Sequence, residues 1–188
     1  GLGSSAQFEE NSGFDGIAEA NGFIVVYPDG IGSAVKDDFA RTWNGGDCCG
    51  PAVKQAVDDV AFIRQLVSQL QQEHQIDPAR IYAAGHSNGG IMSYRLACQA
   101  SDLFAGTGLQ AGTLSIDTCT PSHPVSLLHV HGTADENLPI DGGAGKGVAG
   151  VSFRPPIDGI RTLARLDGCP ATPTTATDPD NADVTVDT

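Results

Sequence analysis

The chain has 188 residues, which is enough for one domain with a substantial core, and 40% of them are hydrophobic. Its formal net charge of −13 disfavours nucleic acids, anionic membrane surfaces and polyanionic polysaccharides, and leaves neutral substrates as the expected partners. No apolar run approaches the roughly 20 residues needed to cross a bilayer, so we expect a soluble protein.

The first quarter of the chain predicts a helix, a strand and a loop. Residues 12–22 predict a short helix, which is capped by Ser12 and ended by the Asn-Gly pair at its end. The continuous apolar run at residues 23–27 predicts a strand that is buried on both faces. Residues 30–51 are rich in glycine and aspartate, which indicates a long loop that carries function.

From residue 51 onward, predicted helices and strands alternate. Apolar residues spaced three and four apart predict an amphipathic helix over residues 51–70, and a second helix is expected at 88–100. Strands are expected at 80–84 and 125–130, and a further helix at 156–166. This alternation predicts an α/β domain with a mostly parallel sheet and helices on both faces.

Five cysteines bear on the compartment in which the protein works. None of their spacings matches a zinc-ligand pattern, and no histidine stands at ligand spacing from any of them. We therefore expect disulfides and a secreted protein, with buried thiols in a cytosolic enzyme as the alternative. The five are Cys48, Cys49, Cys98, Cys119 and Cys169.

Residues 85–89 (GHSNG) form a G-x-S-x-G motif between a predicted strand and a predicted helix. This context is typical of a nucleophile elbow, in which the serine stands on a sharp turn and small neighbours let strand and helix approach. The motif therefore predicts Ser87 as nucleophile, with the backbone N–H of Asn88 stabilising an oxyanion at the helix N-terminus. The alternative is a chance match in a glycine-rich chain.

A serine nucleophile requires a base, and the base requires an orienting carboxylate. In folds with such an elbow, the acid follows a later buried strand. Asp135 meets this requirement, because it follows the predicted strand 125–130 after a glycine turn. Glu136 is its competitor, and an ordinary turn carboxylate is the alternative interpretation of Asp135.

Histidines near this acid allow a second interpretation. His129, His131 and Asp135 could be interpreted as a metal cluster, and because the two histidines would share one face of the strand, two ligands are geometrically possible. A third protein ligand would still be needed, and we expect both histidines to be hydrogen-bonded and the site to hold no metal. His86 is expected to support the elbow rather than act as the base. The other two histidines have no expected role.

At this point the sequence resembles the esterase family that includes polyhydroxybutyrate depolymerases and feruloyl esterases of carbohydrate esterase family one. The resemblance implies an α/β-hydrolase fold and covers residues 22 to about 140. The matching motifs, in the family's order, are residues 26–30 (VYPDG), 43–46 (WNGG) with 48–49 (CC), 58–60 (DDV), 85–90 (GHSNGG) and 131–135 (HGTAD).

The resemblance assigns roles to single residues. Ser87 and Asp135 match the family's nucleophile and acid. Leu2 would supply the second oxyanion N–H beside that of Asn88. Trp43 would line the substrate cleft, and a half-buried packing aromatic is the alternative.

The resemblance also concerns disulfide pairing and the extent of the domain. It implies that Cys98 and Cys119 pair, which would tie the elbow helix to the loop after the next strand. It further implies a first strand before the opening loop and a catalytic histidine beyond Thr188, since no histidine follows Asp135. Residues 1–188 are thus expected to be a single catalytic domain that is truncated at both ends.

Together these observations predict a secreted serine esterase that cleaves carboxylic esters through a Ser-His-Asp acyl-enzyme mechanism. Two substrate classes remain: polyhydroxybutyrate and related hydroxyalkanoate esters, or feruloyl-type aryl esters of plant polysaccharides. An inactive fragment or a binding module of the same fold is the alternative. We expect a monomer without cofactor or metal, which binds a small-molecule or polymeric ester and neither nucleic acid nor membrane.

Overall fold

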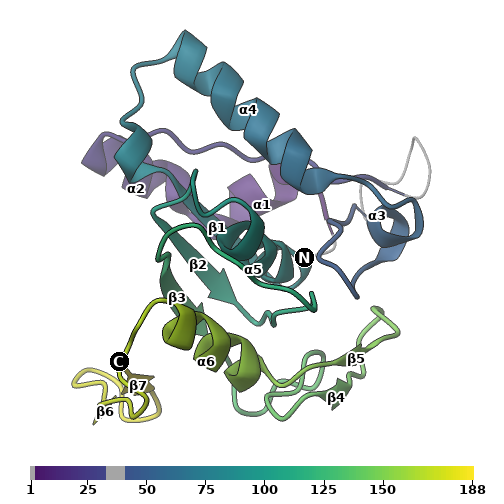
Figure 1. Cartoon of the computed structure of the whole chain (residues 1–188), viewed down its shortest axis with the longest axis vertical. Helices are drawn as coiled ribbons and strands as arrows, with labels where there is room; N and C mark the ends of the chain where they lie inside the picture. Colours follow the sequence, from purple (N-terminus) through teal and green to yellow (C-terminus); the bar gives the residue numbers. More distant parts are fainter. Residues whose placement is uncertain (1–2, 33–40) are drawn as a thin grey trace.

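The structure, a computed structural model, describes residues 3–32 and 41–188 (Figure 1). Its centre is a parallel sheet in the order β1-β2-β3, formed by β1 (Tyr82–His86), β2 (Gly106–Gln110) and β3 (Ser126–Val130). The register aligns Tyr82 with Gly106 and Gly106 with Ser126. Two small antiparallel pairs lie outside this sheet. They are β4 (Gly143–Ala144) with β5 (Ser152–Phe153), and β6 (Thr175–Thr177) with β7 (Thr185–Asp187).

The helices precede and connect these strands. Their bounds are α1 (Ser5–Ser12), α2 (Phe14–Asn21), α3 (Gly50–Lys54), α4 (Asp59–Glu73), the 3-10 helix η1 (Pro78–Arg80), α5 (Asn88–Gln99) and α6 (Pro156–Leu166). The Asp58 side chain caps α4 by accepting the Ala61 N–H at 3.0 Å. None of the described helices is both long and apolar enough to cross a membrane.

Helices cover one face of the parallel sheet. Val60, Ile63 and Val67 of α4 pack with Met92 and Leu96 of α5 into one apolar cluster. A second cluster joins α5 to α6 and to the inward face of the strands, and its buried members are Tyr94, Ala97, Cys98, Leu109, Leu114, Val125 and Leu163. The predicted parallel sheet with packed helices is confirmed, but in the described residues the helices pack on one face of the sheet rather than on both as predicted.

The opposite face of the sheet is open in the described residues. Along β1 and β3, side chains alternate between partly buried and exposed positions. Tyr82 is 65% exposed, Leu128 67% and Val130 51%. Because the strands are parallel and in register, these three residues lie on the same face. An apolar sheet face therefore meets solvent.

The strand predicted at residues 23–27 is wrong. This segment is irregular, and its side chains are exposed to 47% at Phe23, 55% at Ile24 and 41% at Val26. An apolar run forms a buried strand only when neighbouring strands supply hydrogen bonds along its edges. Within the described chain no strand pairs with it. Both this segment and β1 instead line a cavity of about 1310 Å³.

Several predicted boundaries shift by a few residues. The helix predicted at 12–22 is α2, which begins at Phe14 because Gly13 takes a left-handed conformation (φ 70°) between α1 and α2. The helix predicted at 51–70 is split into α3 and α4, since Asp58 caps a new start. The short strand β2 was not predicted, because Gly106 and Gly108 weaken its apolar pattern.

Candidate active site

Ser87 stands on the turn that joins β1 to α5, with φ 56° and ψ −120°. Positive φ is unfavourable for a residue with a side chain, so the surrounding structure must hold it there. The Ser87 N–H donates to the Gln110 carbonyl at 2.9 Å, and the Ser87 carbonyl accepts the Ile91 N–H at 3.0 Å. A Cβ at Gly85 would collide with the backbone of Gly89, so the turn requires glycine there.

Asn88 follows the serine and is 4% exposed. Its side-chain Oδ1 accepts the Trp43 N–H at 2.6 Å, and its Nδ2 donates to the Trp43 carbonyl at 3.0 Å. The side chain therefore holds the backbone of the 43–46 loop beside the elbow. Its backbone N–H lies in the first turn of α5, where amides have no acceptor within the helix.

Two further side chains hold this loop, and the sequence analysis did not identify either. Asp59 accepts the Asn44 N–H at 2.6 Å, and Arg95 donates to the Asn44 carbonyl at 2.7 Å. Asp59 is 2% exposed, and burial raises the pKa of its carboxyl group. The DDV motif at residues 58–60 was the available signal, although its role was not apparent without the fold.

Trp43 packs on helix α4 beside the elbow. Its ring stacks on Phe62 with a centroid distance of 6.2 Å and an interplanar angle of 24°. The ring also borders the apolar cluster of α4 and α5 and lines the large cavity. These contacts match the packing alternative for Trp43 and leave its predicted role in substrate binding open.

Asp135 lies in the loop that follows β3, with its side chain 17% exposed. Its Oδ1 accepts the N–H groups of Asn137 at 2.8 Å and Leu138 at 3.0 Å. Glu136, the competing acid, instead forms an exposed ion pair with Lys146. The contacts of Asp135 match the turn carboxylate that is its alternative interpretation, and the assignment of the acid to Asp135 rather than Glu136 stays a prediction. Leu2, the other predicted oxyanion residue, lies outside the described residues.

His129 and His131 are linked to each other and to their surroundings. His129 Nδ1 lies 2.8 Å from the Tyr94 hydroxyl, and its Nε2 lies 3.0 Å from His131 Nδ1. His131 Nε2 lies 2.9 Å from the Leu138 carbonyl and 3.8 Å from Asp135 Oδ2. Both ring nitrogens of each histidine are thus engaged. Burial, with the neighbouring His131, lowers the pKa of His129 to about 4.

The other histidines lie elsewhere. His86 is on the open face of the sheet and hydrogen-bonds Gln110, and loss of hydration lowers its pKa. His74 caps the exposed end of α4, and His123 contacts Ser122 in a surface loop. Among the described residues, no group of three potential ligands is placed to hold a metal ion.

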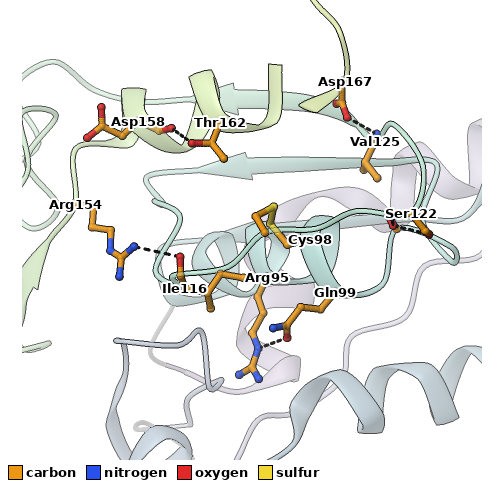
Figure 2. Close-up of a disulfide and its surroundings, with 12 residues drawn as sticks. Arg95, Cys98, Gln99, Ile116, Ser122, Val125, Arg154, Asp158, Thr162 and Asp167 are labelled. Atoms are coloured by element: carbon orange, nitrogen blue, oxygen red, sulfur yellow. Dashed lines mark hydrogen bonds between the residues drawn. A yellow bond between two sulfur atoms is a disulfide. The ribbon is translucent and has the colours of Figure 1, made fainter. Parts of the chain in front are cut away.

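Two disulfides are present, and the first ties α5 to the segment after β2. Cys98 and Cys119 are joined with an S–S distance of 1.95 Å and a Cα–Cα distance of 4.8 Å. Figure 2 shows Cys98 and its bridge beside the strands and below α6. Cys48 and Cys49 form the second disulfide, and Cys169 is free and exposed.

A parallel sheet with packed helices and a strained serine between strand and helix defines the α/β-hydrolase class. Residues 16–122 match the prolyl oligopeptidase family, and the chain belongs to that family.

Curated relatives are esterases by name. The chain is 31% identical over 97% of its length to feruloyl esterase B of Piromyces equi, of which it covers 34%. It is 32% identical over 74% of its length to the putative esterase NocK of Nocardia uniformis subsp. tsuyamanensis, of which it covers 39%. Feruloyl esterase C of Emericella nidulans is 37% identical over 46% of the chain, which spans 32% of that protein. These matches support the feruloyl esterase part of the resemblance, and the polyhydroxybutyrate depolymerase part stays a prediction.

Proposed function

We propose that this chain carries the nucleophile and the acid of a secreted serine carboxylic ester hydrolase. The observation that carries the proposal is the conformation of Ser87, which is held at positive φ where β1 meets α5. Backbone strain of this kind persists only where the surroundings enforce it, and it concentrates at catalytic positions. Similarity to named esterases supports ester cleavage as the reaction.

The proposed reaction has two steps. A histidine takes the Ser87 proton as the hydroxyl attacks the ester carbonyl, and the histidine then protonates the departing alkoxide. Water next attacks the acyl-serine through the same histidine and releases the acid. The Asn88 N–H, together with the amide proposed at Leu2, would stabilise the oxyanion in both steps. Asp135 would orient the histidine and stabilise its positive charge.

We propose that the base lies in a segment outside the described residues. The engaged ring nitrogens of His129 and His131 support this view, since neither ring has a lone pair available for Ser87. The chain spans about a third of the length of feruloyl esterase B, which leaves ample sequence for a further segment. The domain is then completed by that histidine segment and by a strand beside β1.

The large cavity beside β1 supports the proposal of a further strand next to β1. β1 is an edge strand in the described sheet, and the apolar segment 23–27 lines the same cavity as β1. A strand between them would satisfy the free edge of β1 and cover exposed Phe23, Ile24 and Val26. Residues 1–188 are therefore proposed to be an incomplete catalytic domain.

Feruloyl-type esters are the proposed substrate class, because feruloyl esterases recur among the relatives. The test compares the 188-residue chain with a chain extended at both ends, using methyl ferulate and hydroxybutyrate oligomers as substrates. We expect the extended chain to prefer methyl ferulate and Ser87→Ala to abolish cleavage. Preference for the oligomers would select the polyester alternative, and undiminished cleavage by Ser87→Ala would refute the nucleophile.

An inactive fragment or binding module is the second candidate, and the engaged histidines favour it for the 188 residues taken alone. A fluorophosphonate probe separates the two. Slow labelling of Ser87 in the 188-residue chain, with rapid labelling in the extended chain, supports an enzyme whose base lies outside. Slow labelling of both supports a non-catalytic role. Rapid labelling of the short chain would mean that a described histidine serves as base.

We also propose that the protein is secreted, and that the domain is monomeric once the further strand and the histidine segment complete it. The disulfide between Cys98 and Cys119 supports secretion, because such bonds persist mainly in oxidising compartments. Expression in the bacterial cytosol and in the periplasm tests this. Thiol counts should show four oxidised cysteines in the periplasmic protein. If the cytosolic protein were recovered reduced and equally stable, the proposed need for secretion would be contradicted.

A further inference from the structure

A chain of hydrogen bonds connects the elbow helix to the loop that carries the acid, and the proposed mechanism does not use it. It begins at the Tyr94 hydroxyl in α5 and passes through the rings of His129 and His131. It ends at the carbonyl of Leu138, in the acid loop. The three bonds measure 2.8, 3.0 and 2.9 Å, which are ordinary hydrogen-bond lengths.

The chain has only one proton order when both rings are neutral. The Leu138 carbonyl can only accept, so His131 carries its proton on Nε2 and accepts on Nδ1. His129 must then donate from Nε2 to His131, which leaves His129 Nδ1 as an acceptor. The Tyr94 hydroxyl donates to that nitrogen. Every donor in the chain thus faces an acceptor.

Burial preserves this order. Tyr94 is 0% exposed, and the His131 side chain is 5% exposed. Burial raises the pKa of Tyr94 and lowers that of His129 to about 4, so at neutral pH the phenol keeps its proton and the His129 ring stays neutral. The titratable groups that face the pair are Tyr94 from α5 and Asp135 from the acid loop.

The backbone carbonyl and N–H of Leu138 connect this series of hydrogen bonds to Asp135. The Leu138 carbonyl accepts from His131, whereas its N–H donates to Asp135 Oδ1 at 3.0 Å. The Leu138 side chain is itself buried, at 4% exposure. The backbone at Leu138 is therefore held by the ring on one side and holds the carboxylate on the other.

We propose that Tyr94, His129 and His131 are positioning residues, which fix the acid loop and its Asp135 carboxylate relative to the helix that begins after Ser87. The positioning role rests on the proposed function, but the proton order and the anchoring of the loop do not. The inference predicts that removing a single donor or acceptor loosens the loop, even where the volume of the side chain is kept.

The first test reads the proton order directly. In the 188-residue chain labelled with 15N-histidine, the imidazole nitrogen shifts at pH 7 distinguish the two neutral tautomers and the imidazolium ion. We expect both His129 and His131 as Nε2–H tautomers. Tyr94→Phe should leave His129 as the Nε2–H tautomer, because the order is set from the Leu138 carbonyl, whereas His131→Leu should return the Nδ1–H tautomer of His129 to a measurable population, because the acceptor for its Nε2–H is gone. An imidazolium or an Nδ1–H tautomer in the unsubstituted chain would overturn the proposal.

The second test reads the loop by amide hydrogen exchange at residues 132–138, followed by mass spectrometry at low protein concentration. His131→Leu should accelerate exchange roughly tenfold, as expected for one lost hydrogen bond to a buried carbonyl. His131→Gln should stay within about twofold of the original, because its amide nitrogen can still donate to the Leu138 carbonyl. Tyr94→Phe should fall between the two.

This comparison separates positioning from simple packing. Leucine fills the apolar space at least as well as glutamine, so a purely steric role predicts slower exchange in His131→Leu than in His131→Gln, and that result would refute the proposal. If Tyr94→Phe does not fold, the tautomers of the unsubstituted chain and the comparison of His131→Leu with His131→Gln still decide whether the proposal holds. None of these readouts requires ester cleavage, so a failure of the proposed function would leave them standing.

Discussion

At the elbow, the backbones of β1 and α5 approach so closely that residue 85 has no room for a side chain. The sequence predicted this from the spacing of Gly85 and Gly89 around Ser87, because the constraint is local. The contacts of Asp135 are local too, since its carboxylate binds N–H groups two and three residues ahead. The roles of His129 and His131 were predicted only as hydrogen bonding, because Tyr94, the partner of His129, is distant in sequence.

Gly85→Ala tests the elbow at this scale. The added methyl group would meet the Gly89 backbone, which cannot yield without moving the turn, so we expect a loss of about 1–3 kcal/mol in the free energy of unfolding. Denaturant titration measures it. Gly108→Ala in the neighbouring strand is the matched control, because nothing lies within 4 Å of its added Cβ. Equal stability of the two variants would contradict the packing at the elbow.

His129 carries a pH prediction. Its pKa is about 4 in the folded chain and 6.5 as a free side chain, so the unfolded chain binds the extra proton first as the pH falls. The stability from this neutral ring is full above pH 6.5 and is lost toward pH 4, with a loss of about 2–3 kcal/mol. The free energy of unfolding, measured at both pH values, should decrease less toward pH 4 in His129→Gln than in the unsubstituted chain. His74→Gln, at the exposed end of α4, serves as the control. If His129→Gln lost as much unfolding free energy toward pH 4 as the unsubstituted chain, the buried neutral ring would be contradicted.

At the scale of elements, the 43–46 loop shows how helices can organise an irregular segment. Asn88 and Arg95 of α5 and Asp59 of α4 bind its backbone from two sides. The sequence identified the loop as functional but did not reveal these hydrogen bonds to its backbone, because the bonded pairs are separated by 15 to 51 residues. Helices α4 and α5 themselves were predictable, since their apolar spacing and caps are written into neighbouring residues.

Asn88→Ala tests the pair of hydrogen bonds that the Asn88 side chain makes to the Trp43 backbone. The N–H of Trp43 would lose its partner and the Trp43 carbonyl would keep only the long bond from the Cys49 N–H at 3.4 Å, so we expect a loss of about 2–3 kcal/mol in unfolding free energy. Trp43 is the only tryptophan of the chain, so its fluorescence should shift to longer wavelength as the loop loosens. Asn88→Asp keeps the acceptor and should lie between. Asn11→Ala on exposed α1 is the control, and unchanged emission from Asn88→Ala would argue against these hydrogen bonds.

At the scale of the whole molecule, the parallel sheet has helices on one face and exposed Tyr82, Leu128 and Val130 on the other. Together with the free edge of β1, this face gives the 188-residue chain a surface for self-association. The small β6–β7 hairpin lies apart from the sheet, at the C-terminal end (Figure 1). The sequence predicted helices α2, α4, α5 and α6 and strands β1 and β3, but it missed β2 and placed a strand wrongly at 23–27. Which surfaces stay open depends on what packs against them.

We therefore expect the 188-residue chain to associate as its concentration rises, as measured by light scattering. Leu128→Lys should reduce association because it places a charge in the open face. Val148→Lys is the control, since Val148 is 83% exposed in the loop between β4 and β5. A monomeric chain with a sharp cooperative melt at all concentrations would show that the open face and edge are harmless.

Sequence alone determined the features that depend on near neighbours: the elbow around Ser87, the turn that presents Asp135, and the amphipathic helices α4 and α5. Steric fit in a tight turn and the period of a helix are settled within a few residues, so the pattern suffices. Tertiary structure decided that residues 23–27 do not form a buried strand, that Asn88 holds Trp43, and that Tyr94 meets His129. Those outcomes require partners far along the chain, and no local pattern records which distant groups will meet.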